Sequence, residues 1–200
     1  MLALPMTLNR TAETEEARIA RGLRERDTEL LADLVERCQH RLVRYLVYLT
    51  GRREHAEDLA QEAWIRVMQR GSQYNGRQRF EPWLFAIARN LAIDSIRKRL
   101  KAAPTVSSPD DRDAVLLLPS SGPSPFEAAA RSEDAMRMAG RLQILPPLYR
   151  EALLLRFQEE LSLAEIAQVV GAPVTTVTSR IYRGLAALRS AFEEGNSHGV

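Results

Sequence analysis

The chain has 200 residues, of which 45% are hydrophobic and 27% charged, the composition of an ordinary globular protein with one or two domains. Its net charge of only +2 excludes a polycation that coats nucleic acid by bulk charge, so any nucleic-acid binding must come from local basic clusters. The single cysteine, Cys38, excludes an intramolecular disulfide and a zinc site built from several cysteines.

The sequence carries no signal for export or membrane insertion. It has no run of about 18 apolar residues, which a membrane-spanning helix needs. Its first residues, MLALPMTLNR, lack the basic region and apolar core of a secretion signal. We therefore expect a cytoplasmic protein.

The N-terminal part of the chain has the apolar spacing of helices. Residues 1–27 are predicted to form a leader that ends in a short helix over Thr14–Arg26, after which Asp27 or Thr28 caps a longer helix. The longer helix is expected to bury one face, because its apolar residues recur at i, i+3, i+4 and i+7. We expect it to end at Gly51, since glycine is common directly after the last turn of a helix. These residues are Leu31, Leu34, Val35, Cys38, Leu42, Tyr45, Leu46 and Leu49.

Two further helices complete a first domain over residues 28–102. One is expected over Glu54–Gln69 and has an apolar side and a polar side. The other begins at Phe80, and Pro82 is tolerated in its first turn. Between them lies a loop, Gly71–Arg79 (GSQYNGRQR), that holds two glycines and an asparagine.

A change of composition marks the boundary to a second domain. Residues 103–125 are rich in proline, serine and glycine, which is typical of a linker. Residues 126–194 return to a helical pattern, with helices expected over Phe126–Leu142 and Leu148–Glu159, and residues 195–200 form a tail. The sequence therefore predicts an all-α fold, with two helical domains joined by a flexible linker.

The stretch Leu161–Arg189 has the pattern of a helix-turn-helix. Ser162 and Glu165 predict a capping box at the start of a short helix, and Gly171 supplies the turn. A second, basic helix follows and runs to about Phe192.

The basic helix has one apolar side and one side suited to a major groove. We expect Thr175 or Thr176 to cap it. The residues expected to face the core are Val177, Ile181, Leu185 and Leu188. The opposite side carries Thr176, Ser179, Arg180 and Arg183. Arginine pairs with two acceptors on guanine and hydroxyls reach phosphates or base edges, although a plain solvated face remains the alternative.

A second basic helix end lies about eighty residues upstream. Aromatic residues that precede or begin this helix are Tyr74, Phe80, Trp83 and Phe85, and its polar residues are Asn90, Asp94, Arg97, Lys98 and Arg99. Aromatic rings that stack on unpaired bases, beside cations that hold phosphates, suit single-stranded DNA. Alternatively, Trp83 and Phe85 belong to the core and the cations are a solvated helix end.

No catalytic pattern is found in the sequence. The three histidines, His40, His55 and His198, occur in separate contexts, with no His/Glu pair at metal-binding spacing. A glycine loop that cradles phosphate and a nucleophile in a turn motif are also missing. We therefore expect a protein that is not an enzyme and needs neither a metal nor a cofactor.

Three segments together resemble the extracytoplasmic function (ECF) group of bacterial RNA polymerase sigma factors. AEDLAQEAWIRVM (56–68) is similar to the polymerase-binding helix of sigma region 2. FEPWLFAIARNLAIDSIRKR (80–99) is similar to the helix that melts and reads the −10 element. LPPLYREALLLRFQEELSLAEIAQVVGAPVTTVTSRIYRGLAALR (145–189) resembles region 4, which reads the −35 element.

The resemblance implies roles for individual residues and partners. It assigns polymerase binding to Asp58, Gln61 and Glu62. It assigns binding of the −10 DNA to Tyr74, Asn75, Phe80, Trp83, Asn90, Asp94, Arg97, Lys98 and Arg99. It assigns binding of the −35 DNA to Thr175, Thr176, Thr178, Ser179, Arg180 and Arg183. The partners that it implies are core RNA polymerase, through its beta and beta-prime subunits, promoter DNA, and an anti-sigma factor.

Two other functions fit parts of the sequence. A stand-alone helix-turn-helix regulator would explain the last segment, and would bind an operator tightly without polymerase. An adaptor that binds only proteins would keep the polar helix at 56–68 and would not depend on Arg180 or Arg183 for DNA binding.

Overall fold

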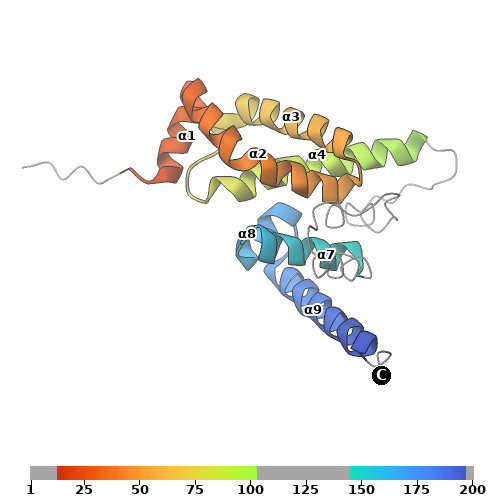
Figure 1. Ribbon diagram of the computed structural model, residues 1–200. Coiled ribbons are helices and arrows are strands. Elements are labelled where there is room, and N and C mark those ends of the chain that lie inside the picture. The colour runs from red at the N-terminus through yellow and green to blue at the C-terminus, as the bar shows by residue number, and fades with distance from the viewer. Residues whose placement is uncertain (1–12, 103–144, 197–200) are drawn as a thin grey trace, which may run out of the picture.

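The computed structural model describes residues 13–102 and 145–196, and in these residues every regular element is helical (Figure 1). Four α-helices, α1 to α4, form a bundle, and α7, α8 and α9 form a smaller unit beside it. This confirms the predicted all-α fold of two helical units. The expected linker and the expected helix Phe126–Leu142 lie outside the described residues, and no helix within the described ranges is long and apolar enough to span a bilayer.

The first two helices meet at a tight corner that side chains cap. α1 covers Glu15–Glu25, and the Thr14 hydroxyl accepts a hydrogen bond from the Ala17 amide at its start. α2 covers Thr28–Thr50, and the Asp27 carboxylate accepts from the first two amides that follow Thr28. Both caps satisfy amides that have no partner within the helix. The predicted cap at Asp27 is confirmed.

The core of the bundle follows the predicted apolar stripe of α2. Most of its members are fully buried, and two at its start, Leu31 and Val35, are partly buried at the edge. Gly51 ends α2 with a φ of 72°, as expected for a glycine at this position. Burial raises the pKa of the Cys38 thiol to about 11, so this cysteine is a structural residue of the core.

Helices α3 and α4 close the bundle on either side of α2. α3 covers Arg53–Arg70, and its buried alanines let its backbone come close to its neighbours. A short 3₁₀ turn, η1, follows over Gly71–Gln73, and α4 covers Phe80–Ala102. The loop between η1 and α4 turns at Gly76, whose φ is +68°. A side chain at this position would place its Cβ only 2.7 Å from the Glu16 carbonyl oxygen, so the loop requires glycine here.

The C-terminal unit is a helix-turn-helix supported by one further helix. α7 covers Pro147–Leu153 and continues into a π-helical turn, η3, over Leu154–Gln158, so the expected single helix Leu148–Glu159 is divided. α8 covers Leu163–Val170, with the predicted capping box between Ser162 and Glu165 present.

The last helix begins earlier than expected. α9 covers Val174–Asn196, and the amides of Thr176 and Val177 donate to the carbonyl of Pro173. The prediction that Thr175 or Thr176 caps this helix is therefore wrong, because both lie within its first turn. The turn before it is as predicted, with Gly171 at a φ of 66°.

Two glycines with similar positive φ values allow a matched test of the loop at Gly76. Gly171→Ala adds a Cβ into open space, so it should cost only the left-handed backbone strain, on the order of 1 kcal/mol. Gly76→Ala adds the same strain and a contact with backbone, so its cost should be on the order of 2–4 kcal/mol. Urea unfolding followed by circular dichroism measures both, and equal losses would contradict this account of the loop.

Candidate nucleic-acid and protein interface

The outer face of α3 combines polar and apolar side chains. Asp58 and Gln61 are exposed, and Glu62 is half-buried in an ion pair with Arg66, with 3.1 Å between Glu62 Oε1 and Arg66 Nε. These three predicted residues therefore share one exposed side of a single helix, as their i, i+3, i+4 spacing requires. In Figure 1, α3 lies on the side of the bundle away from the C-terminal unit.

Sequence reasoning missed two apolar residues on the same helix. Ile65 and Met68 are exposed although they are large and apolar. With Leu23 and Leu31 they line a cavity of about 330 Å³ at the corner between α1 and α2. Their spacing from Gln61 could have shown this, since Ile65 lies four residues after it on the polar side of the helix. Exposed apolar residues beside charged ones are typical of a protein-binding surface.

The loop before α4 is built on an aromatic cluster. Tyr74 is only 3% exposed, and its ring centroid lies 5.6 Å from that of Phe80 and 5.4 Å from that of Trp83. Its hydroxyl donates to the Gln78 carbonyl oxygen. Trp64 of α3 stacks on Phe80, and Trp83 is half-buried.

This cluster changes the interpretation of two predicted base-stacking residues. Tyr74 and Phe80 are buried, so neither presents a ring face to a base in this conformation. Their rings instead form the small core on which the loop rests, because a short polar loop otherwise has little apolar surface to bury. The loop presents Asn75 and Arg79 to solvent, and Asn75 Oδ1 accepts from the Arg77 amide.

The basic end of α4 lies exposed along the bundle. Asn90, Asp94, Lys98 and Arg99 are exposed, and Arg97 is half-buried with its Nη1 3.9 Å from Asp94 Oδ1. The structure thus places these five predicted residues on the second half of one helix. Three of them share a groove of about 490 Å³ with side chains of α3. The lining residues are Leu59, Glu62, Arg66, Leu91, Asp94, Ser95, Arg97 and Lys98.

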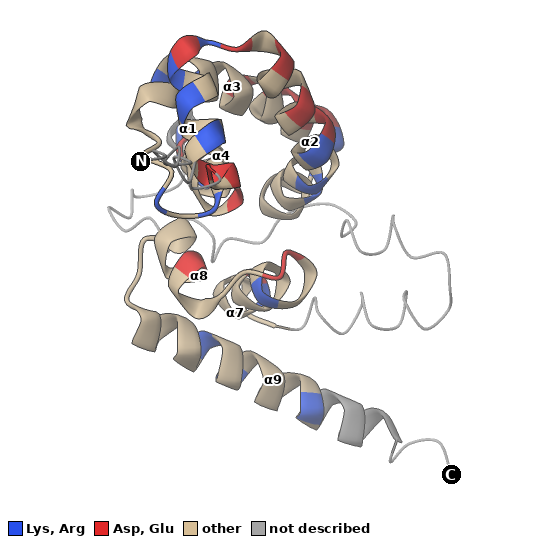
Figure 2. Cartoon of the chain, turned by 90° about the vertical axis from the view of Figure 1, so that its left-hand side faces the viewer, with Lys and Arg blue, Asp and Glu red and all other residues tan. Residues whose placement is uncertain are grey.

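Helix α9 carries the second predicted DNA-reading surface. Thr175 and Arg183 are exposed, and four further predicted residues are half-buried, namely Thr176, Thr178, Ser179 and Arg180. Between Val174 and Ser190 the helix has arginines and no acidic residue (Figure 2). A side without acids suits an approach to phosphates.

The prediction that four residues of α9 face the core is correct for two of them. Val177 and Ile181 are buried, whereas Leu185 is 41% exposed and Leu188 is partly buried. Gly184 lies against Leu153, so α7 and α9 cross closely at this point. Beyond the crossing α9 extends past its neighbours, which is why the same apolar spacing no longer leads to burial (Figure 1). Tyr182, which the sequence did not single out, is exposed.

Known proteins match both units of the chain. The family model Sigma-70 region 2 matches residues 34–101, and Sigma-70, region 4 matches residues 136–188. The chain is 31% identical over 171 residues to the ECF RNA polymerase sigma factor SigW of Bacillus subtilis (strain 168), covering 84% of this chain and 91% of that protein.

Two further similarities agree with these matches. The chain is 34% identical over 165 residues to the ECF RNA polymerase sigma factor SigE of Mycolicibacterium smegmatis, covering 82% of this chain and 62% of that protein. In fold it resembles the sigma factor RpoE in complex with the anti-sigma factor NepR from Bartonella quintana, with a TM-score of 0.61 and 20% identity, over 81% of this chain and 96% of that one.

Substitution of Tyr74 tests its structural role in the loop. Tyr74→Phe loses one hydrogen bond and should lower the free energy of unfolding by about 1 kcal/mol. Tyr74→Ala removes the ring from the cluster and should cost on the order of 3–5 kcal/mol. Urea unfolding followed by tryptophan fluorescence is a direct measurement, because Trp64 and Trp83 both contact the cluster. An unchanged unfolding midpoint for Tyr74→Ala would instead indicate an exposed ring.

Proposed function

The chain belongs to the ECF family of RNA polymerase sigma factors, and from this premise we propose that its two units read the two elements of one promoter while docked on core polymerase. The observation that carries the proposal is the separation of three surfaces: the outer face of α3, the basic end of α4, and the arginine side of α9. Promoter recognition needs all three. The chemistry of RNA synthesis belongs to polymerase, and the chain acts with it in the cytoplasm.

We assign polymerase binding to the outer face of α3. Asp58, Gln61 and Glu62 supply charge and hydrogen bonds for the beta-prime coiled coil, and the neighbouring Ile65 and Met68 add apolar surface. This combination is favourable for a protein contact, because acids orient the partner while apolar burial supplies affinity. The beta subunit is the second contact that the family implies.

We assign the −10 element to α4 and the loop before it. Lys98 and Arg99 are exposed and suited to hold phosphates of the opened strand, while Asn75 and Asn90 present amides that can pair with bases. Trp83, at the half-exposed edge of the aromatic cluster, is the ring best placed to stack on a base. Tyr74 and Phe80 support the loop from beneath.

We assign the −35 element to α9, the second helix of the helix-turn-helix. Arg183 and Thr175 are its most exposed predicted contacts, and Arg183 can bridge two acceptors of a guanine in the major groove. An anti-sigma factor is the regulatory partner that we propose for the chain, since the structurally similar RpoE was crystallised with one.

Removal of polar groups from α3 should weaken polymerase binding alone. For Asp58→Ala combined with Gln61→Ala, we expect at least about a tenfold loss of affinity for core polymerase, which corresponds to about 1.4 kcal/mol. Glu36→Ala, an exposed acid on α2, is the control and should bind like the unmodified chain. Titration of labelled chain with core enzyme measures both, and equal affinities for the two variants would refute the assignment to α3.

Truncation of one arginine on α9 should alter promoter choice. Arg183→Ala should cost on the order of 1–3 kcal/mol in holoenzyme binding and relax the preference for one base of the −35 element. Arg189→Ala is the matched control, because Arg189 is exposed on the same helix nearly two turns farther on. Transcription from a library of −35 sequences gives the readout. If both variants kept the original preference, Arg183 would not read a base.

A further inference from the structure

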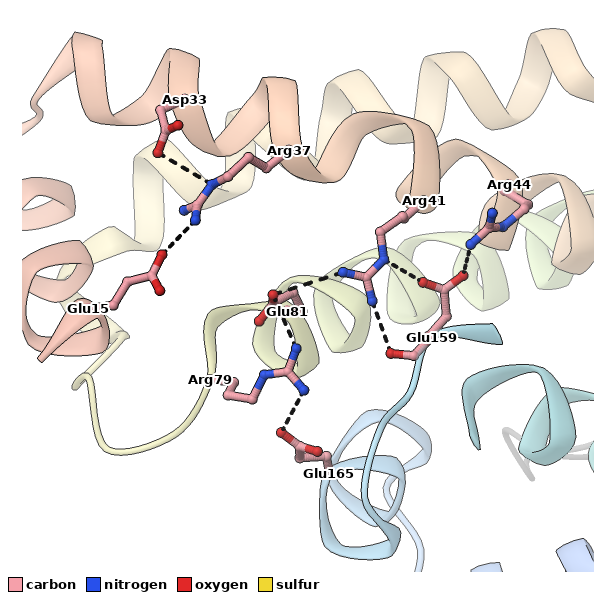
Figure 3. Close-up of polar contacts among 9 residues, drawn as sticks. All are labelled: Glu15, Asp33, Arg37, Arg41, Arg44, Arg79, Glu81, Glu159 and Glu165. Carbon is pink, nitrogen blue, oxygen red and sulfur yellow. Dashed lines mark hydrogen bonds and ion pairs between the residues drawn. The ribbon is translucent and has the colours of Figure 1, made fainter. Parts of the chain in front are cut away.

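Two acidic residues of the C-terminal unit, Glu159 and Glu165, face arginines of the bundle (Figure 3). Glu159 Oε2 lies 2.8 Å from Arg41 Nε, and its other carboxylate oxygen pairs with Arg44. Arg41 also donates to the Glu159 carbonyl oxygen at 3.0 Å. At the edge, Arg79 Nη1 lies 3.8 Å from Glu165 Oε1. In each contact between the units the cation belongs to the bundle and the anion to the C-terminal unit, while Arg41 and Arg79 also pair with Glu81 of the bundle itself.

A second pair lies deeper in the same interface. Arg89 of α4 and Glu151 of α7 are 2% and 1% exposed, with 2.8 Å between Arg89 Nε and Glu151 Oε1. The Tyr45 hydroxyl donates to the same carboxylate at 2.7 Å, and burial raises the pKa of Tyr45, so this hydroxyl remains a donor. Tyr48 donates to the Pro147 carbonyl oxygen at 2.8 Å. All these contacts join residues about 60 to 120 positions apart in the chain.

An interface closed by buried charges can also open. An intact buried ion pair contributes little net stability, because the attraction between the charges mainly offsets the loss of their hydration. Removal of one partner is strongly destabilising, because it leaves the other charge buried and unpaired. When the units separate, the carboxylate of Glu159, now 0% exposed, and its two arginines regain water. Within the described residues Arg44 Nε is buried without a hydrogen-bond partner, which weakens the closed state further. An apolar interface of the same extent would have no such compensation.

The closed arrangement conflicts with the proposed promoter contacts. α8, the first helix of the helix-turn-helix, packs against α4, the helix assigned to the −10 element. The −35 and −10 elements are about 25 base pairs apart, or on the order of 85 Å at 3.4 Å per pair. Two units in direct contact cannot read both at once.

We propose that the free chain is held in a self-inhibited form by an interdomain latch, in which Glu159 binds Arg41 and Arg44 and Glu151 binds Arg89. This inference rests on the proposed function, because only a promoter-reading protein must part its two units. Binding to polymerase and promoter selects the open form, and the latch lowers the apparent affinity by the fraction of chains that are closed.

Distance measurements on the full chain test the latch. Fluorophores attached at Glu36→Cys and Ser190→Cys report the separation of the units by energy transfer, and the buried Cys38 is poorly reactive. Glu159→Gln keeps the shape of the side chain and removes its charge, so transfer should fall. Glu160→Gln, the exposed neighbour, is the control and should keep the transfer of the unmodified chain.

A second variant removes the charges on the bundle side of the latch. Arg41→Gln with Arg44→Gln should open the chain as Glu159→Gln does, so the test remains valid if one variant folds poorly. Opened variants that keep their circular dichroism spectrum should bind core polymerase several-fold more tightly, in proportion to the closed fraction removed.

The outcomes separate the latch from the proposed function. Transfer that stays the same in Glu159→Gln, in the arginine double variant and in the Glu160→Gln control would overturn the latch, whatever polymerase binding shows. Loss of transfer in both latch variants, with no polymerase binding by any chain, would support the latch as a contact but overturn the proposed function and the self-inhibition that rests on it. Opening together with tighter polymerase binding supports both.

Discussion

The burial of α2 is the interaction on which the rest of the structure depends. Its apolar stripe is covered by α3 on one side and α4 on the other, so the register of this one helix fixes both surfaces that we assign to the polymerase and to the −10 element. The same register places Arg41, Arg44, Tyr45 and Tyr48 toward the C-terminal unit, because residues three, four and seven apart lie on one side of a helix. One helix thus builds the core and positions the interdomain contact.

The polar chemistry of that contact differs from the packing of α2 within the bundle. Within the bundle, large apolar groups are removed from water, and parting the helices would expose them at about 25 cal/mol per Å². Between the units, buried arginine–carboxylate pairs add contacts whose separated forms are well hydrated. The two units can therefore stay folded while the distance between them changes, which a sigma factor needs if it is to exist both free and on a promoter.

The sequence predicted the local features of the fold and missed those set by distant partners. Caps at Asp27 and Ser162 and turns at Gly51 and Gly171 were predictable, because their chemistry acts within a few residues. The stripe of α2 was predictable from its period. By contrast, Tyr74 and Phe80 were expected to contact −10 DNA and are buried, because composition does not distinguish a base-stacking ring from a core ring.

Long-range pairing lay beyond any argument from spacing. Arg41 and Glu159 are 118 positions apart, and each looks like an ordinary charged residue on a helical segment. Leu185 shows the opposite error, since its spacing matches the apolar side of α9 but no neighbouring helix reaches it. Burial is decided by what packs against a residue, so the end of a packed unit cannot be read from periodicity.

The position of α3 indicates the order in which polymerase docking and separation of the two units occur. α3 lies on the side of the bundle away from the C-terminal unit in both views of the chain (Figures 1 and 2). Its polar and apolar residues are therefore exposed while the latch is closed. With polymerase binding assigned to this face as we propose, polymerase can dock before the units part, whereas reading both promoter elements requires that they have parted. A closed chain is thus able to meet polymerase, and the contacts that polymerase and promoter DNA make only with the parted units then supply the differential affinity that keeps the units open.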